Sequence, residues 1–217
     1  MTVKSRGARV LKGALVAIDP DAPTPRVVSF QYNPATLKRS LKPLLVGGEP
    51  GDRSQAVRIT GAPTETVSVE IEIDAADRLG DGDAIAGTLG IHPQLAALEL
   101  LSYPPSSRVV RNATLLSAGT IEIAPLLAPR VLFVWGQRRV LPVEIASYTV
   151  SEDEFDSNLN PIRATVSLEM RVLTYSDLSE SNADYHQYLA YQQFLESVAG
   201  NAVTNDTKPL GGPAIVS

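Results

Sequence analysis

Apolar and polar side chains alternate strictly along two stretches of the chain, residues 66–74 and 162–173. A period of two puts alternate side chains on opposite faces of a β-sheet. In the second stretch we expect a buried apolar set, Ile162, Ala164, Val166, Leu168, Met170 and Val172. The polar set expected on the opposite face is Arg163, Thr165, Ser167, Glu169 and Arg171. One buried face and one polar face are typical of an antiparallel sheet.

Residues 66–74 supply a second pair of faces. The apolar positions are Val67, Val69, Ile71 and Ile73, and the polar positions are Ser68, Glu70 and Glu72. If the two stretches are neighbouring strands, the outward glutamates could pair with Arg163 and Arg171, because opposite charges across two strands attract. This pairing is a hypothesis about the register.

The stretch 162–173 belongs to a module, residues 130–175, with three strand-like runs separated by two turn signals. Residues 131–135 are a short apolar run, and a Gly-containing turn follows at residues 136–139. Such a turn between two apolar runs predicts a hairpin. Residues 140–150 form the longer second run, in which Pro142 predicts a sheet edge or a bulge because proline has no N–H to donate.

Residues 151–160 are polar and acidic and end in Asn160-Pro161, so we interpret them as a turn. Runs 140–150 and 162–173 are therefore predicted to be adjacent antiparallel strands. The turn holds four carboxylates, Glu152, Asp153, Glu154 and Asp156, which are a candidate cation site. Acidic turns between strands are more often simply solvated.

The N-terminal part predicts two further strands, residues 14–18 and 26–32, the second ending at Asn33-Pro34. Val28, Phe30 and Tyr32 share one face of the second strand. No strand is predicted in the polar, basic segment 35–42. Residues 44–61 and 75–90 are rich in glycine and charge, and we interpret both as loops.

Helical spacing of apolar residues appears twice, at residues 92–101 and 184–199. Pro93 suits the first turn of the first helix, and Gly200-Asn201 suits the end of the second. The stripe of the second helix either packs on its own sheet or forms an interface; its members are Tyr185, Tyr188, Leu189, Gln192, Leu195 and Val198. Residues 106–129 are ambiguous, with a short strand conceivable at 120–123. This divides the chain into a β domain (1–178), a C-terminal helix (179–200) and a flexible tail (201–217).

The composition is that of a soluble globular protein: 217 residues, 44% hydrophobic, 20% charged, with a net charge of −5. The negative charge argues against nucleic acid as a partner. The chain has no cysteine, which excludes disulfides and thiolate chemistry. The apolar run before residue 19 is too short for a signal peptide or a membrane span.

Motifs that would indicate an active site are missing. Residues 77–83 resemble a calcium loop, but Leu79 and Thr88 stand where ligands are required. His92 and His186 have no ligand partners at metal-binding spacing, so we expect both to be structural. Trp135 lies on an apolar run and is expected in the core. There is no nucleophile turn and no phosphate loop, so we expect no enzyme, cofactor or metal.

Several segments together resemble the tube-protein domain of contractile injection systems, which are phage-tail-like particles. The resemblance covers about residues 10–195 and is nearest to the tube initiator, the baseplate protein between the spike hub and the inner tube. It rests on motifs in a matching order: Phe30-Gln-Tyr-Asn-Pro34, Pro93-Gln-Leu-Ala-Ala-Leu-Glu-Leu-Leu101, Phe133-Val-Trp-Gly136, Leu141-Pro-Val143, Glu154-Phe-Asp156 and Leu159-Asn-Pro-Ile-Arg-Ala164.

This resemblance implies a tail-tube-like antiparallel β-barrel with a flanking helix, assembled as a homo-hexameric ring. The implied partners are the spike hub, the inner tube protein and other baseplate subunits, without direct membrane insertion. Assembly would take place in the cytoplasm. Many members carry a C-terminal LysM module, for which this chain has no room after its last helix. The polar set of residues 163–171 then becomes a candidate for the channel lining or the ring interface.

Two other functions stay open from the sequence. The chain could be the main inner-tube subunit, although such subunits are usually shorter. It could also be a non-enzymatic binding module for a glycan or an effector cargo, acting through the polar face of the sheet.

Overall fold

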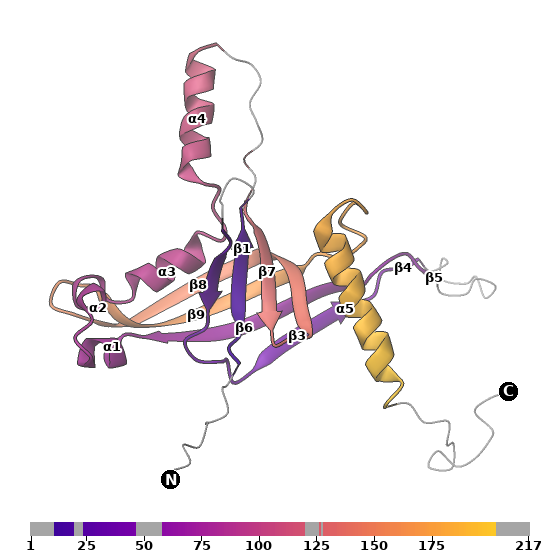
Figure 1. Ribbon diagram of the computed structural model, residues 1–217, viewed down its shortest axis with the longest axis horizontal. Helices are drawn as coiled ribbons and strands as arrows, with labels where there is room; N and C mark the ends of the chain where they lie inside the picture. Colours follow the sequence, from indigo (N-terminus) through magenta and orange to yellow (C-terminus); the bar gives the residue numbers. More distant parts are fainter. Residues whose placement is uncertain (1–10, 20–23, 47–57, 120–125, 127, 203–217) are drawn as a thin grey trace, which may run out of the picture.

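The computed structural model describes residues 11–19, 24–46, 58–119, 126 and 128–202 (Figure 1). Seven antiparallel strands form one open sheet in the order β2-β1-β7-β8-β9-β6-β3. A separate two-stranded sheet pairs β4 (Leu45–Val46) with β5 (Arg58–Ile59). The strands of the main sheet are β1 (Ala14–Ile18), β2 (Arg26–Ser29), β3 (Leu37–Lys42), β6 (Thr64–Asp74), β7 (Arg130–Trp135), β8 (Arg139–Phe155) and β9 (Pro161–Val172).

Five helices accompany the sheet in the described part of the chain. They are α1 (Ala76–Gly80), α2 (Ala84–Leu89), α3 (His92–Glu99), α4 (Ser106–Ser117) and α5 (Ala183–Ala199). Helices α1 and α2 lie at one end of the sheet, and α4 projects away from it with no buried residue (Figure 1). Helix α5 packs against β8 and buries Tyr188 and Tyr191 in the same core as the strands.

The core is the inner face of the sheet, covered by α3 and α5. The alternation in β6 and β9 is confirmed: Val67, Val69, Ile71 and Ile73 are buried, and so are Ala164, Val166, Leu168, Met170 and Val172. Of the expected inward set only Ile162, near the start of β9, is partly exposed. Leu95, Leu98 and Leu101 close the core from the α3 side.

The predicted pairing of the two long strands is confirmed, but their extent was wrong. β8 runs to Phe155, and Ser151 and Glu154 pair with Thr165 and Arg163 of β9. Residues 151–155 are therefore strand, and the turn is confined to residues 156–160. The Asp156 carboxylate holds this turn by accepting the N–H groups of Asn158 and Asn160, at 2.7 and 2.8 Å.

Pro142 marks neither an edge nor a bulge. It is buried in β8, between β7 and β9, in regular register with Leu132. Its carbonyl still accepts the Leu173 N–H at 2.8 Å, so the missing N–H interrupts little of the pairing. The register shifts of β8 against β9 instead fall between Ile145 and Ser147 and between Glu152 and Phe155.

Regular structure occurs in two segments interpreted as loops, 44–61 and 75–90, and in the segment 35–42, for which no strand was predicted. Residues 75–90 hold α1 and α2, and the Asp83 side chain caps α2 by accepting the Ile85 N–H at 2.8 Å. These helices are only 5 and 6 residues long, too short for an apolar period to be recognised. Residues 35–42 contain the edge strand β3, and the 44–61 segment contains β4 and β5.

The remaining differences are local. β2 ends at Ser29, and Tyr32 is 48% exposed instead of sharing the buried face of Phe30. The ambiguous segment 106–129 contains α4, while the conceivable strand at 120–123 lies outside the described residues, as does most of the predicted tail. Helices α3 and α5 confirm both helix predictions. In the stripe of α5, Tyr188 is buried, whereas Leu195 and Val198 are each 39% exposed.

Candidate functional site: the polar face of the sheet

The polar positions of β9 lie on the outer face of the sheet, opposite the core. We call the outward side chains of β6, β8 and β9 the polar face. The register places one β6 residue and one β8 residue beside each of the five polar side chains of β9. The rows are Asp74, Arg163 and Glu154; Glu72, Thr165 and Ser151; Glu70, Ser167 and Thr149; Ser68, Glu169 and Ser147; and Thr66, Arg171 and Glu144.

Arg163 is neutralised by carboxylates from both neighbouring strands. Its Nε donates to Asp74 Oδ2 at 2.9 Å and its Nη1 to Glu154 Oε1 at 2.8 Å. The hydrogen bond and charge of Asp74 raise the pKa of Arg163. A hydrogen bond from the Ala76 N–H, more than Arg163 itself, lowers the pKa of Asp74 below its ordinary 3.8.

Arg171 is held in the same way at the other end of the face. Its Nη2 donates to Glu144 Oε2 and its Nη1 to Asp177 Oδ1, both at 2.9 Å. Burial acts to raise the pKa of Asp177, but hydrogen bonds from Thr174 and Arg171 outweigh it, so the pKa is lowered. The hydrogen bond to Asp177 is the largest cause of the raised pKa of Arg171.

The proposed pairing of these arginines with Glu70 and Glu72 is wrong. The register sets Glu70 opposite Ser167 and Glu72 opposite Thr165, one or more rows away from either arginine. The actual partners come from the end of β6, from β8 and from the turn after β9, and the sequence pattern carried no information on that register. Sequence reasoning accordingly missed Asp74, Glu144 and Asp177 as members of the site.

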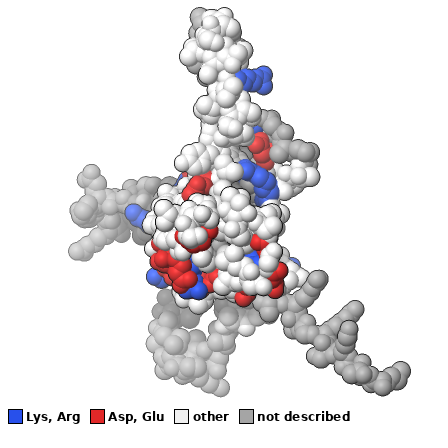
Figure 2. All heavy atoms as spheres, turned by 90° about the vertical axis from the view of Figure 1, so that its left-hand side faces the viewer, with Lys and Arg blue, Asp and Glu red and all other residues white. Residues whose placement is uncertain are grey.

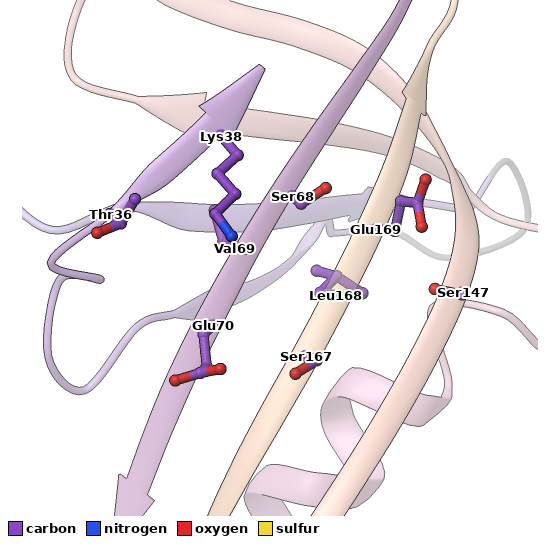
Figure 3. Close-up of a pocket in the computed structure, with 9 residues that line it drawn as sticks. All are labelled: Thr36, Lys38, Ser68, Val69, Glu70, Ser147, Ser167, Leu168 and Glu169. Carbon is purple, nitrogen blue, oxygen red and sulfur yellow. The ribbon is translucent and has the colours of Figure 1, made fainter. Parts of the chain in front are cut away.

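Between the two ion-paired rows the polar face is built mostly of small hydroxyl side chains. A groove of about 390 Å³ runs across them (Figure 3). Figure 3 shows side chains from β3, β6, β9 and β8 side by side around it. Its lining comprises Thr36, Lys38, Ser68, Val69, Glu70, Ser147, Ser167, Leu168 and Glu169. Hydroxyl groups here offer hydrogen bonds to water or to a polar surface.

The other candidate residues are not brought together. Asp156 is engaged in its turn and Glu154 in the pair with Arg163. Within the described ranges, no three acidic or histidine side chains converge as ligands for a metal ion. His92 and His186 are both exposed, and Trp135 is partly buried with its ring stacked on Phe133 at 5.9 Å.

The chain matches no protein-family model, and no curated protein sequence is significantly similar to it. In the part of the chain that the structure describes, no helix combines the length and the apolarity needed to cross a membrane. The structure defines a mainly β protein with a seven-stranded antiparallel sheet and a long polar face.

Proposed function

We propose that this chain is a structural ring subunit of a contractile injection system, the tube initiator that joins the spike hub to the inner tube. In this proposal the ring is a hexamer, its partners are the hub, the inner tube protein and other baseplate subunits, and it performs no catalysis. The polar face is the observation that carries the proposal, together with the resemblance of the quoted motifs.

The polar face suits the wall of a water-filled channel. Its two arginines are each bound by two carboxylates, so neither presents an unbalanced positive charge to a passing molecule. Between them lie six hydroxyl side chains, which hydrogen-bond water, and three glutamates, Glu70, Glu72 and Glu169, which give the face a net negative charge. A face of this kind supports passage better than tight binding.

The open edges of the sheet support assembly into a ring. β2 and β3 are the two edge strands, and each leaves a row of backbone N–H and C=O groups without a strand partner in the described sheet. Unpaired edges invite association with another chain. A heterologous contact that repeats through a full turn closes into a ring and covers both edges.

The tail-tube-like barrel requires the sheet to curl until its two edges approach. β2 and β3 are at opposite edges, yet only residues 30–36 connect them. The Gln31 side chain also binds the backbone of Asp74 in β6 twice: its Nε2 donates to the carbonyl at 2.8 Å, and its Oε1 accepts the N–H at 3.0 Å. An amide that takes the place of a strand partner supports a sheet that curls toward a barrel, while the outer edges of β2 and β3 stay unpaired in the described sheet and open to neighbouring subunits.

Imaging of the complete particle tests this function. We expect a single six-fold ring of this subunit between the spike and the tube. Repeated copies along the whole tube would instead identify the main inner-tube subunit. Absence from the ring, with the chain bound to cargo or glycan through the groove, would identify a binding module. Either result would overturn the initiator proposal.

A further inference from the structure

One end of the molecule exposes apolar side chains on a rigid support. This end, which we call the acidic pole, consists of residues 74–90 and 151–163 and lies where α1, α2 and the β8–β9 turn meet (Figure 1). Leu159 is 78% exposed, Ile85 58%, Phe155 48% and Leu89 45%. Ile85 and Leu89 are one helical turn apart on α2, so they share a face. Exposed apolar groups that gather at one end indicate a binding surface.

The acidic pole is held in place by hydrogen bonds to backbone carbonyl groups. The Ile91 N–H donates to the Pro161 carbonyl at 2.9 Å, and Asn160 Nδ2 donates to the Thr88 carbonyl at 3.1 Å. Gly90 has a φ of +58°, and a Cβ there would lie 2.1 Å from the Pro161 carbonyl oxygen. Only glycine allows this close approach of the helices to the hairpin. The surface is therefore preorganised, which lowers the entropy cost of binding.

The charge of the chain is concentrated at this pole. It holds eight acidic residues and two arginines, a net of −6, whereas the whole chain carries −5. Figure 2 looks onto this end and shows the carboxylates gathered over it. Five of them are exposed: Asp77, Asp81, Glu152, Asp153 and Glu154.

The opposite end of the molecule is basic and also exposes apolar side chains. We call it the basic pole: residues 35–46 and 58–64, with β3, β4 and β5. Lys38, Lys42 and Arg58 are exposed there, and these two described ranges contain no acidic residue. Four apolar side chains are exposed beside them: Leu41 (52%), Leu44 (40%), Leu45 (55%) and Ile59 (72%).

The long strand β6 separates the two poles. Lys42 of β3 pairs with Thr64 at one end of β6, and Asp74 at its other end adjoins α1. Its 11 residues at about 3.3 Å each span roughly 35 Å. Neither pole is complementary to itself, because the acidic pole has a net negative charge and the described residues of the basic pole have a net positive charge, so each fits the other pole and not its own copy.

We propose that the acidic pole docks on the basic pole of a second copy of this chain, head to tail. The inference rests on the proposed function in that a ring brings several copies together, and it adds to the edge contact a second contact at the ends of the strands. Apolar contacts at the centre and opposite charges at the rim are the arrangement of a specific protein interface. Since the two surfaces differ, the contact is heterologous and repeats from copy to copy.

Cysteine pairs test the contact directly, because the natural chain has no cysteine. Leu159→Cys and Leu45→Cys are made separately, and the two purified variants are mixed with a short thiol-specific crosslinker. We expect a crosslinked dimer from the mixture and none from either variant alone. The matched control replaces Leu45→Cys with Leu116→Cys on α4, which projects away from both poles (Figure 1) and whose Leu116 is 60% exposed; it should give no dimer with Leu159→Cys. A dimer formed by Leu159→Cys alone would overturn the head-to-tail arrangement.

Charge reversal gives a second readout, measured by sedimentation equilibrium of the full chain. The double variant Asp81→Lys/Asp153→Lys should weaken self-association about tenfold, and 0.5 M NaCl should weaken the natural contact. Adding Lys42→Glu/Arg58→Glu in the other copy should restore it. The control, Glu99→Lys on α3 between the poles, should change the dissociation constant less than about twofold.

A chain that stays monomeric up to about 1 mM, with no crosslink from the mixture, would overturn the second copy as the occupant. So would unchanged association after charge reversal. In that case the initiator function would still stand if imaging finds the six-fold ring. If imaging finds no ring but the head-to-tail dimer forms, the initiator function is rejected and the pole contact stands.

Discussion

Neighbouring side chains in β9 have opposite surroundings. Val166 is fully buried, while Thr165 lies on the polar face opposite Glu72. Val166→Asp places an unpaired carboxylate in the core and should destabilise the fold by more than about 4 kcal/mol, preventing soluble expression. Thr165→Asp adds only a like charge beside Glu72 and should cost less than about 1 kcal/mol. Thermal melts that agree between the two variants would contradict the assignment of faces.

A buried hydroxyl sets a limit to stability at high pH. The Tyr148 hydroxyl is buried and has no hydrogen-bond partner among the described residues. Burial, followed by the charges of Glu99 and Glu152, raises the pKa of Tyr148 to about 12. The folded state therefore keeps its proton where the unfolded state has lost it, so stability falls as the pH rises from about 10 to about 12.

Tyr148→Phe removes this effect. The variant should unfold at the same or a slightly higher urea concentration at pH 7, because no hydrogen bond is lost. Between pH 10 and about 12 it should lose less stability than the natural chain. Equal losses in that window would show that Tyr148 does not carry the effect.

At the scale of elements, α5 is attached to the sheet by a charged contact as well as by its tyrosines. Arg130 Nε of β7 donates to Asp184 Oδ1 at 2.6 Å, and the Asp184 side chain is 3% exposed. Asp184→Ala should destabilise the protein by about 2 kcal/mol, because it leaves a charge-assisted bond unmade beside a half-buried guanidinium. The measurement is urea unfolding followed by circular dichroism.

The comparison variant is Glu144→Ala. Its carboxylate pairs with Arg171 on the polar face, with side-chain exposures of 60% and 40%. An exposed pair contributes less than about 1 kcal/mol, so this variant should lose much less stability than Asp184→Ala. A larger loss of stability for Glu144→Ala would mean that the exposed ion pair of the polar face stabilises the fold more than the more deeply buried Arg130–Asp184 pair does.

At the scale of the whole molecule, acid should unfold the chain through several carboxylates together. Hydrogen bonds lower the pKa of Asp74, Asp156 and Asp177 below the ordinary 3.8. The unfolded chain takes up these protons first as the pH falls, so the stabilisation is present above about 4 and is lost below it. Asp74→Asn/Asp177→Asn should flatten the loss of stability between pH 4.5 and about 2.5. An unchanged slope in urea titrations would contradict this.

The distribution of charge is also a property of the whole molecule. Residues that are far apart in the sequence, 74–90 and 151–163, meet at one end because β6 and β9 are antiparallel neighbours. The acidic composition of segment 151–160 was visible in the sequence, but its position next to α1 and α2 at one end of the molecule was not. The proposed head-to-tail contact therefore depends on the topology of the sheet.

By itself, the sequence determined which side of β6 and of β9 is buried and where α3 and α5 lie. A period of two or of 3.6 residues is a local property, and burial of one face follows from it wherever the strand or helix is placed. It also indicated the pairing of β8 with β9, because only a short polar segment separates them.

Only the tertiary structure decided which side chains meet. Arg163 and Arg171 find Asp74, Glu154, Glu144 and Asp177 because backbone hydrogen bonds between distant segments set the register, which no local pattern encodes. The same long-range pairing makes strands of residues 37–42 and 151–155, whose polar composition alone suggests loops. Pairing with a neighbouring strand supplies the hydrogen bonds that local propensity does not predict.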